Sequence, residues 1–209
     1  MKYVILMMWT MIHLVSLGYA QQYLKNGDII FVADNQSAFA QSINSATNKE
    51  HGYNYNHVAL LQIQDNDSFV WHATTKYGVV KQSFESFKLL HPMSNIDIYR
   101  LEDLSKLSDA EINQLFSSNA KHLGKGYNYS FIPNDTSYYC SEFVLELMGS
   151  FLRYNLIPMN FKDLKTGIMP TFWIEYYQKL GIQIPQDILG SNPNDLAKQS
   201  SAVYQFRLQ

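Results

Sequence analysis

Residues 138–144 read Tyr-Tyr-Cys-Ser-Glu-Phe-Val and contain the only cysteine of the 209-residue chain, Cys140. From Phe143 to Phe151, apolar residues recur every three or four positions, a spacing typical of one buried helix face. The pattern predicts a helix that begins at Cys140. The positive end of a helix favours a thiolate, and its free N–H groups can bind an oxyanion. Cys140 is therefore a candidate nucleophile; the alternative is a small buried apolar residue.

Length and charge limit the classes of protein to consider. The chain has 46% hydrophobic and 16% charged residues, which fits one domain with a sizeable core. The formal net charge is −2, with acidic and basic residues interspersed, so neither a nucleic-acid groove nor a polybasic membrane surface is indicated. The sequence contains no internal repeat, glycine-rich phosphate loop or paired-cysteine metal motif. We expect no nucleic-acid partner and no cofactor.

The N-terminus has the features of a signal peptide. Lys2 precedes a mostly apolar run, and small residues stand at the two positions that signal peptidase reads, ending at Ala20. We expect residues 1–20 to be removed and residues 21–209 to form a single exported domain, periplasmic or extracellular. The apolar run is short for a stable membrane span, although an uncleaved anchor is the alternative. A lone thiol in an oxidising compartment lacks the usual disulfide partner, which favours a chemical role for it.

Apolar runs and turn residues predict an α+β chain. Short apolar runs predict strands at residues 29–32, 57–63, 68–74, 79–82, 96–101 and 203–208. Helical periodicity and capping residues predict helices at residues 36–47, 108–124, 140–151, 170–181 and 194–200. We interpret 83–90 as a turn, 158–169 as irregular, and 124–139 as a long aromatic loop leading to the cysteine.

Two histidines belong to one predicted hairpin. A turn at Asp65-Asn66 places His57 opposite Thr74, so that His72 lies diagonally across from His57. Two imidazoles at that separation can meet. Either histidine alone would be an ordinary surface or packing residue. Their pairing in a chain with one thiol favours a nucleophilic site.

The motifs in this order resemble a known family. Gly-Asp-Ile-Ile-Phe at 27–31, His-Val-Ala-Leu at 57–60, Val-Trp-His-Ala at 70–73 and Tyr-Cys-Ser-Glu-Phe at 139–143 look like the permuted NlpC/P60 papain-like cysteine hydrolases, specifically the YiiX/YebB-like group. The resemblance spans nearly all of the mature chain. It implies a circularly permuted papain-like (NlpC/P60) fold, with an antiparallel sheet packed against helices. The permuted order, histidine first and cysteine last, is the order here.

The resemblance also implies roles. Cys140 corresponds to the nucleophile and His57 to the general base. His72 falls at the third polar position, where many permuted members have glutamate and non-permuted NlpC/P60 enzymes usually have histidine. The Cys140 N–H and the Tyr139 hydroxyl are candidates for the oxyanion site, and Tyr127 is a candidate for the cleft.

The implied activity is that of a thiol hydrolase. It would cleave an amide, such as a peptide or an N-acyl compound of cell-wall origin, through an acyl-enzyme on Cys140. Three alternatives stay open: a lipid acyltransferase or thioesterase of the same fold, a catalytically inert binding module, and a metal site built from His57, His72 and Cys140. The metal site lacks a short chelating pair, so we expect no metal. We expect a peptide, N-acyl or lipid-like small substrate and no stable membrane span, and leave the oligomeric state open.

Overall fold

The computed structural model describes residues 23–34, 37–48 and 54–208. The signal peptide expected at residues 1–20 lies outside these ranges. The strands are β1 (Ile29–Ala33), β2 (His57–Gln64), β3 (Asp67–Thr74), β4 (Gly78–Ser83), β5 (Asn95–Leu101), β6 (Gly126–Tyr127), β7 (Ser137–Tyr138), β8 (Ile157–Met159), β9 (Ile188–Gly190) and β10 (Ala202–Leu208). The α-helices are α2 (Ala38–Thr47), α3 (Phe84–Leu90), α4 (Asp109–Ser118), α5 (Cys140–Leu152), α6 (Thr171–Leu180) and α7 (Pro193–Gln199).

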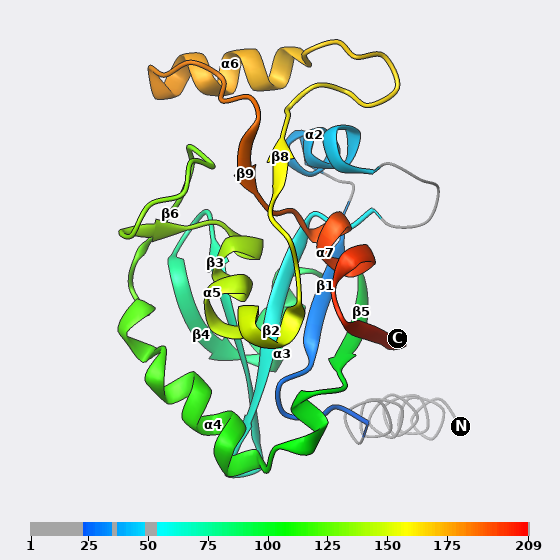
Figure 1. The fold of residues 1–209 in the computed structure, drawn as a ribbon, viewed down its shortest axis with the longest axis vertical. Helices are drawn as coiled ribbons and strands as arrows, with labels where there is room; N and C mark the ends of the chain where they lie inside the picture. The colour runs from blue at the N-terminus through cyan, green and yellow to red at the C-terminus, as the bar shows by residue number, and fades with distance from the viewer. Residues whose placement is uncertain (1–22, 35–36, 49–53, 209) are drawn as a thin grey trace, which may run out of the picture.

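A six-stranded antiparallel sheet forms the centre of the fold, in the order β10-β5-β1-β2-β3-β4 (Figure 1). In the β2–β3 hairpin Leu60 lies opposite Trp71, the register that a turn at Asp65-Asn66 predicts. Both turn residues have positive φ, of 52° and 70°, which suits a tight hairpin. The described residues therefore form the mixed helix and antiparallel-sheet architecture expected from the sequence.

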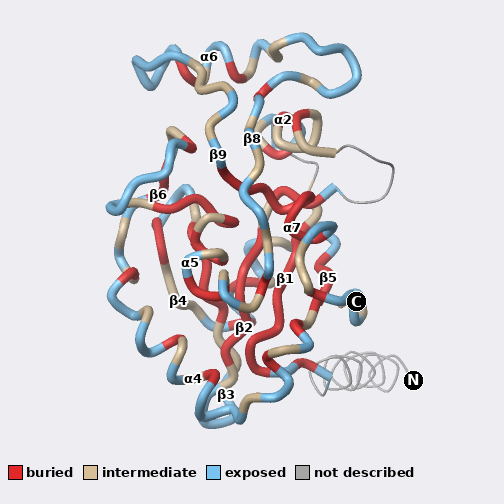
Figure 2. The backbone as a smooth tube through the Cα atoms, viewed as in Figure 1, coloured by how far each residue is buried: buried red, intermediate tan, exposed pale blue. Residues whose placement is uncertain are grey.

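The two faces of the sheet are covered by different helices. Alternate residues of a strand point to opposite faces. Val58 belongs to the larger apolar cluster, which includes Phe143 of α5, whereas Ala59 belongs to a second cluster with Phe84 and Phe87 of α3. Figure 2 shows β1 and β2 buried over most of their length. At the start of β2, alternate side chains therefore face α5 on one side of the sheet and α3 on the other.

Several segments differ from the sequence prediction. The helix expected at 108–124 ends at Ser118 and is followed by a 3₁₀ helix at Ala120–His122, and the loop expected at 124–139 contains the short parallel pair β6–β7. Of residues 83–90, expected to be a turn, Phe84–Leu90 form α3, in which Phe84 and Phe87 are buried. Ser83 caps this helix, because its Oγ accepts a hydrogen bond from the Ser86 N–H. A seven-residue helix is too short to show a clear period. Part of 158–169, expected to be irregular, lies in β8, which pairs antiparallel with β9 far along the chain. Local patterns do not reveal such a long-range pairing.

A cluster of aromatic side chains lies beyond one end of the sheet. α2, α6 and the β8–β9 pair lie together there (Figure 1). Phe39 of α2 contacts Trp173 of α6 with ring centroids 6.0 Å apart, and Phe131 contacts the same indole at 6.0 Å. These ring contacts hold three segments that are distant in sequence against one another, and Phe131 and Trp173 line the same cavity as Cys140.

A buried ion pair connects the start of β1 to β5. Arg100 donates to the fully buried carboxylate of Asp28 through Nε at 2.7 Å and Nη2 at 2.8 Å. We expect Arg100→Ala to lower the free energy of unfolding by about 3–5 kcal/mol, because the carboxylate stays buried without its partner. Lys106→Ala, which breaks an exposed pair with Asp103, should cost at most about 1 kcal/mol. Denaturant titration measures both; equal losses would contradict this account.

Candidate active site

Cys140 is the first residue of α5, as predicted. Glu142 accepts a hydrogen bond from the Tyr139 N–H at 3.1 Å, so this carboxylate caps the helix. The Cys140 side chain is buried. The backbone N–H groups of Val58, Ser141 and Cys140 itself lie near its sulfur and lower the pKa of the thiol. Backbone donors from a strand and a helix start therefore converge on Sγ, where negative charge would develop during nucleophilic attack.

Burial nevertheless keeps this thiol protonated. Desolvation raises the pKa of Cys140 to about 11, and the backbone N–H groups lower it by less than burial raises it. The expectation that the helix start alone favours the thiolate is therefore wrong for the protein in this state. Burial disfavours the charged form more strongly than a half-charge of helix dipole favours it. A thiolate must form here together with proton transfer to a base.

The hairpin brings the two histidines together. His57 Nε2 lies 2.8 Å from His72 Nδ1, within hydrogen-bond distance. Behind this pair, the Gln82 carboxamide lies close enough to raise the pKa of His72, although His72 Nε2 is buried without a well-aligned partner. The arrangement fixes the ring of His57 through a second ring that is itself held in the sheet.

Both imidazoles are neutral at physiological pH. Desolvation is the main cause in each case; it places the pKa of His57 well below its ordinary value and that of His72 at about 3. For His57, charge repulsion from His72 and then from His91 adds to the effect; the His91 ring lies with its centroid 5.8 Å from that of His57. The resting site thus contains a neutral thiol and neutral imidazoles.

The thiol and the histidines line two neighbouring cavities. Cys140 lines a cavity of about 220 Å³, and His57 and His72 line another of about 210 Å³; Asn56 and Tyr127 belong to both walls. No hydrogen bond joins the thiol to either imidazole in the part of the chain that the structure describes. The structure therefore brings the histidines together and places the thiol in a neighbouring cavity that shares part of its wall with theirs.

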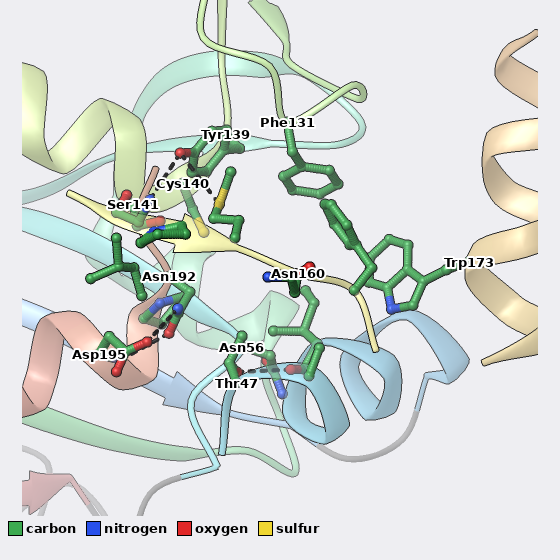
Figure 3. Close-up of a pocket in the computed structure, with 18 of the residues that line it drawn as sticks. Thr47, Asn56, Phe131, Tyr139, Cys140, Ser141, Asn160, Trp173, Asn192 and Asp195 are labelled. Atoms are coloured by element: carbon green, nitrogen blue, oxygen red, sulfur yellow. Dashed lines mark hydrogen bonds between the residues drawn. The ribbon is translucent and has the colours of Figure 1, made fainter. Parts of the chain in front are cut away.

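The two tyrosines predicted for the cleft have different surroundings. The Tyr139 hydroxyl accepts a hydrogen bond from the Ser191 N–H at 3.2 Å and lies 4.0 Å from Met159 Sδ, so it belongs to the cavity wall (Figure 3). Burial and the nearby Cys140 thiol raise the pKa of Tyr127, so its hydroxyl keeps its proton. Tyr127 is the better placed hydrogen-bond donor, because it lines the cavities of both the thiol and the histidines.

Two site residues escaped the sequence analysis. Asn56 directly precedes His57 and donates a short hydrogen bond to the Asp34 carbonyl. The sequence indicates a place for Asn56 in the site only through its position directly before His57, at the start of a predicted strand. His91 follows α3, a segment whose sequence predicts a turn, so no sequence pattern places its ring on His57.

Buried neutral histidines make the fold sensitive to acid. The pKa of His72 is about 3 in the folded protein and about 6.5 in an unfolded chain, so unfolding takes up a proton between these values and stability falls as pH falls. For His72 alone we expect a loss of about 2–3 kcal/mol between pH 7 and pH 4.5. Urea titration at both pH values should show a smaller loss for His72→Gln. Equal losses in the two proteins would rule out this contribution.

Comparisons with known proteins show the family of the chain and a structure of similar fold. The sequence model of a family described as permuted papain-like amidase enzyme, YaeF/YiiX, C92 family, matches residues 23–201. A solved structure, described as the metalloprotein yiiX from Escherichia coli O157:H7, is similar with a TM-score of 0.70 and 23% sequence identity, covering 88% of this chain and 97% of that one. No curated protein matches.

The described residues contain neither a metal-binding cluster nor a membrane-spanning helix. In ranges 23–34, 37–48 and 54–208, no three or more His, Cys, Asp or Glu side chains are arranged to hold a metal ion. His57, His72 and Cys140 therefore do not form the joint metal site considered from the sequence. Over the same ranges, no helix combines the length and apolar character needed to cross a bilayer.

Proposed function

This chain belongs to the YaeF/YiiX, C92 family of permuted papain-like amidases, which are cysteine hydrolases, and we propose that it cleaves an amide through an acyl-enzyme on Cys140. His57 is the general base and His72 positions it. One observation carries the proposal: a thiol surrounded by backbone N–H groups lies across a shared wall from a hydrogen-bonded histidine pair. The order of the motifs supports a wider relation to the NlpC/P60 enzymes.

The neutral resting state determines how the reaction begins. As Sγ of Cys140 bonds to the substrate carbonyl carbon, its proton passes to Nδ1 of His57. The tautomer in which Nε2 of His57 donates to His72 leaves Nδ1 free to accept this proton. We place the contact between Sγ and Nδ1 in the substrate complex, because catalytic hydrogen bonds are often long before substrate binds.

The remaining steps return both groups to their starting state. The imidazolium gives its proton to the leaving amine as the C–N bond breaks, which leaves a thioester on Cys140. Water then attacks this thioester as His57 takes a proton from it. The C–S bond breaks, the imidazolium returns the proton to the departing sulfur, and the acid product leaves. His72 accepts the hydrogen bond that holds the His57 ring; as a neutral group it stabilises the imidazolium less than a carboxylate would.

Tyr127 supplies a hydrogen bond to the tetrahedral oxyanion, together with backbone N–H groups at the start of α5. We expect Tyr127→Phe to lower kcat about 10- to 100-fold with little change in KM, because the bond strengthens only as charge develops. Tyr129→Phe is the matched control: it removes a neighbouring hydroxyl that bonds the Thr75 carbonyl instead. Steady-state kinetics of both variants on one amide substrate decide the point, and equal effects would remove Tyr127 from the oxyanion site.

A panel of small amides tests the proposal directly. Peptide amides, N-acyl amines and the corresponding esters are offered to the full mature protein, and release of the amine or alcohol is measured. Hydrolysis that stops when iodoacetamide modifies Cys140 supports the proposed activity. Hydrolysis that survives complete modification of this thiol would overturn it.

We further propose that the protein acts outside the cytoplasm. Support comes from the signal-peptide pattern that ends at Ala20. Mass spectrometry of the protein recovered from its producing cells should give a mature N-terminus at Gln21, as glutamine or pyroglutamate. An intact Met1 would contradict cleavage.

A further inference from the structure

One ring nitrogen of His72 contacts His57, and the other has no assigned role. Nδ1 of His72 lies 2.8 Å from Nε2 of His57, whereas Nε2 of His72 is buried and has no well-aligned hydrogen-bond partner among the described residues. The whole residue is 1% exposed, so water has little access to this nitrogen. Leaving a buried polar nitrogen unpaired is costly, so the groups around it matter.

The polar side chain next to this ring is that of Gln82. It belongs to β4, the edge strand that pairs with β3 (Figure 1). His72 lies opposite Val80 and Gln82 lies opposite Val70, so His72 and Gln82 are diagonal neighbours on one face of the sheet. Burial is the largest influence on the pKa of His72 and lowers it, and a hydrogen bond with Gln82 acts in the opposite direction. Nε2 of Gln82 is itself buried without a partner among the described residues.

Helix α3 covers this face of the sheet with an aromatic ring. The Phe87 centroid lies 5.2 Å from that of His72 and 6.3 Å from that of His57. The charged side chains of α3, Glu85 and Lys88, pair with each other at 2.9 Å. The histidine pair is therefore enclosed by an apolar ring on the helix side.

The other charged groups nearby are few. Lys81 of β4 lies opposite Trp71, on the other face of the sheet, with its Nζ 4.1 Å from the centroid of the Phe69 ring. His91, after α3, acts on both histidines, and its own pKa is lowered by burial and raised by Asp34. In the part of the chain that the structure describes, Gln82 is thus the side chain whose hydrogen bond favours a proton on His72.

The Gln82 carboxamide can meet His72 in two ways, and each fixes the protons on both rings. When Oε1 of Gln82 faces Nε2 of His72, that nitrogen carries a proton and donates it, so Nδ1 accepts from Nε2–H of His57. Nδ1 of His57 is then free to take the proton of the thiol. When an N–H of Gln82 faces the ring instead, His72 donates from Nδ1 and His57 carries its proton on Nδ1. In that second state His57 cannot act as the base.

We infer that Gln82 is a positioning residue: its Oε1 accepts a hydrogen bond from Nε2–H of His72 and thereby keeps Nδ1 of His57 free to act as the base. Its effect on rate rests on the proposed function. The terminal torsion of glutamine is soft, so a rotation of the carboxamide aligns this bond at little cost. An uncharged acceptor also fits two buried imidazoles, because a carboxylate would favour a proton on the pair before substrate arrives.

Gln82→Met removes the acceptor and keeps a side chain of similar length. We expect kcat to fall about 10-fold with KM within about 3-fold of wild type, because the productive tautomers lose their preference. Gln82 lines neither the thiol cavity nor the histidine cavity, so substrate contacts stay unchanged. Lys81→Met is the matched control on the next residue of β4, which faces the other side of the sheet, and should keep wild-type kcat. Equal kcat in the two variants would overturn the positioning role.

Gln82→Glu keeps an acceptor at the same place and adds a negative charge. The acid limb of kcat/KM should move to higher pH by at least about one unit, because the carboxylate stabilises a cationic histidine pair. On the plateau above this limb, kcat should stay within about 3-fold of wild type. A side chain that only packs against the sheet would leave the limb in place, so an unmoved limb would contradict the inferred role.

Magnetic resonance of the mature protein labelled with ¹⁵N in its histidines reports the tautomers without any substrate. Protonated and unprotonated ring nitrogens have separate ¹⁵N shifts, and the spectra of His57→Ala and His72→Gln assign the two rings. We expect both rings of the wild-type protein to carry their proton on Nε2 at neutral pH. In Gln82→Met, part of the His57 signal should move to the Nδ1–H form, while the unfolding midpoint shows that the variant is folded.

These spectra separate the role of Gln82 from the proposed hydrolase. If the Nε2–H tautomers depend on Gln82 but the wild-type protein hydrolyses no amide, the positioning role stands and the hydrolase falls. If hydrolysis depends on Cys140 but the tautomers and the acid limb are the same with and without Gln82, the hydrolase stands and the positioning role falls. A wild-type protein in which His57 carries its proton on Nδ1 would also overturn the positioning role.

Discussion

The Cys140→Ser variant is expected to lose at least about 10⁴-fold in kcat on any amide that the wild-type protein hydrolyses. Serine keeps the shape of the side chain and fits under the same backbone N–H groups, but its hydroxyl is far harder to deprotonate than a thiol. In a site where burial already raises the pKa of the thiol to about 11, the weaker acid cannot pass its proton to a neutral imidazole at a useful rate.

Stability measurements must show that the loss of kcat in Cys140→Ser does not come from unfolding. Cys140 packs in the main apolar cluster, but a serine hydroxyl there can accept a hydrogen bond from the backbone N–H groups beside the sulfur, so the unfolding midpoint should change little. Substrate affinity, measured as a dissociation constant, should also change little, since the walls of the cavity are unaltered. A serine variant that retains more than a tenth of wild-type turnover while folded would remove the thiol from the chemistry.

His57→Ala is expected to lower kcat by about 10²- to 10⁴-fold, the usual contribution of a positioned general base. Added imidazole should restore part of the rate, because a soluble base can enter the space left by the ring. His91→Ala is the matched control: His91 stacks on His57, yet the mechanism gives it no proton to carry. The kcat of His91→Ala should fall by no more than about 10-fold. Equal losses, or no rescue by imidazole, would assign His57 a packing role.

The pH profile gives a second test of His57. The base must be neutral, and burial places its pKa well below the ordinary value of 6.5. The acid limb of kcat/KM is therefore expected below pH 6.5, with activity retained through neutral pH. A limb at or above 6.5 would mean that the catalytic imidazole is hydrated or paired with a negative charge, neither of which fits the His57–His72 pair.

The sequence predicted the elements that position the site. The apolar period after Cys140 placed α5, and the turn at Asp65-Asn66 set a hairpin register that brings His57 within 2.8 Å of His72. These features follow from local rules: a helix shows its buried face every three or four residues, and a two-residue turn fixes which strand residues face each other.

Local rules predicted neither the raised pKa of the Cys140 thiol nor the β8–β9 pairing beside the cavity. A helix start favours a thiolate, but the burial of the thiol outweighs this preference, and burial depends on segments that come together only in the folded chain, such as those of Tyr139 and Met159, which line the same cavity as Cys140. The β8–β9 pairing, which borders this cavity, joins segments separated by α6. Its strands are too short to show an alternating pattern of their own.

The central claim is that an acyl group passes through the sulfur of Cys140, and mass spectrometry of the quenched reaction tests this most directly. The mature protein is mixed with an acyl ester of a good leaving group, stopped with acid within one turnover, and digested. We predict the mass increment of that acyl group on the peptide that carries Cys140, present in the wild-type protein and strongly reduced in His57→Ala. Hydrolysis of the ester at an undiminished rate by Cys140→Ala, with the acyl group on another residue or on none, would contradict the account.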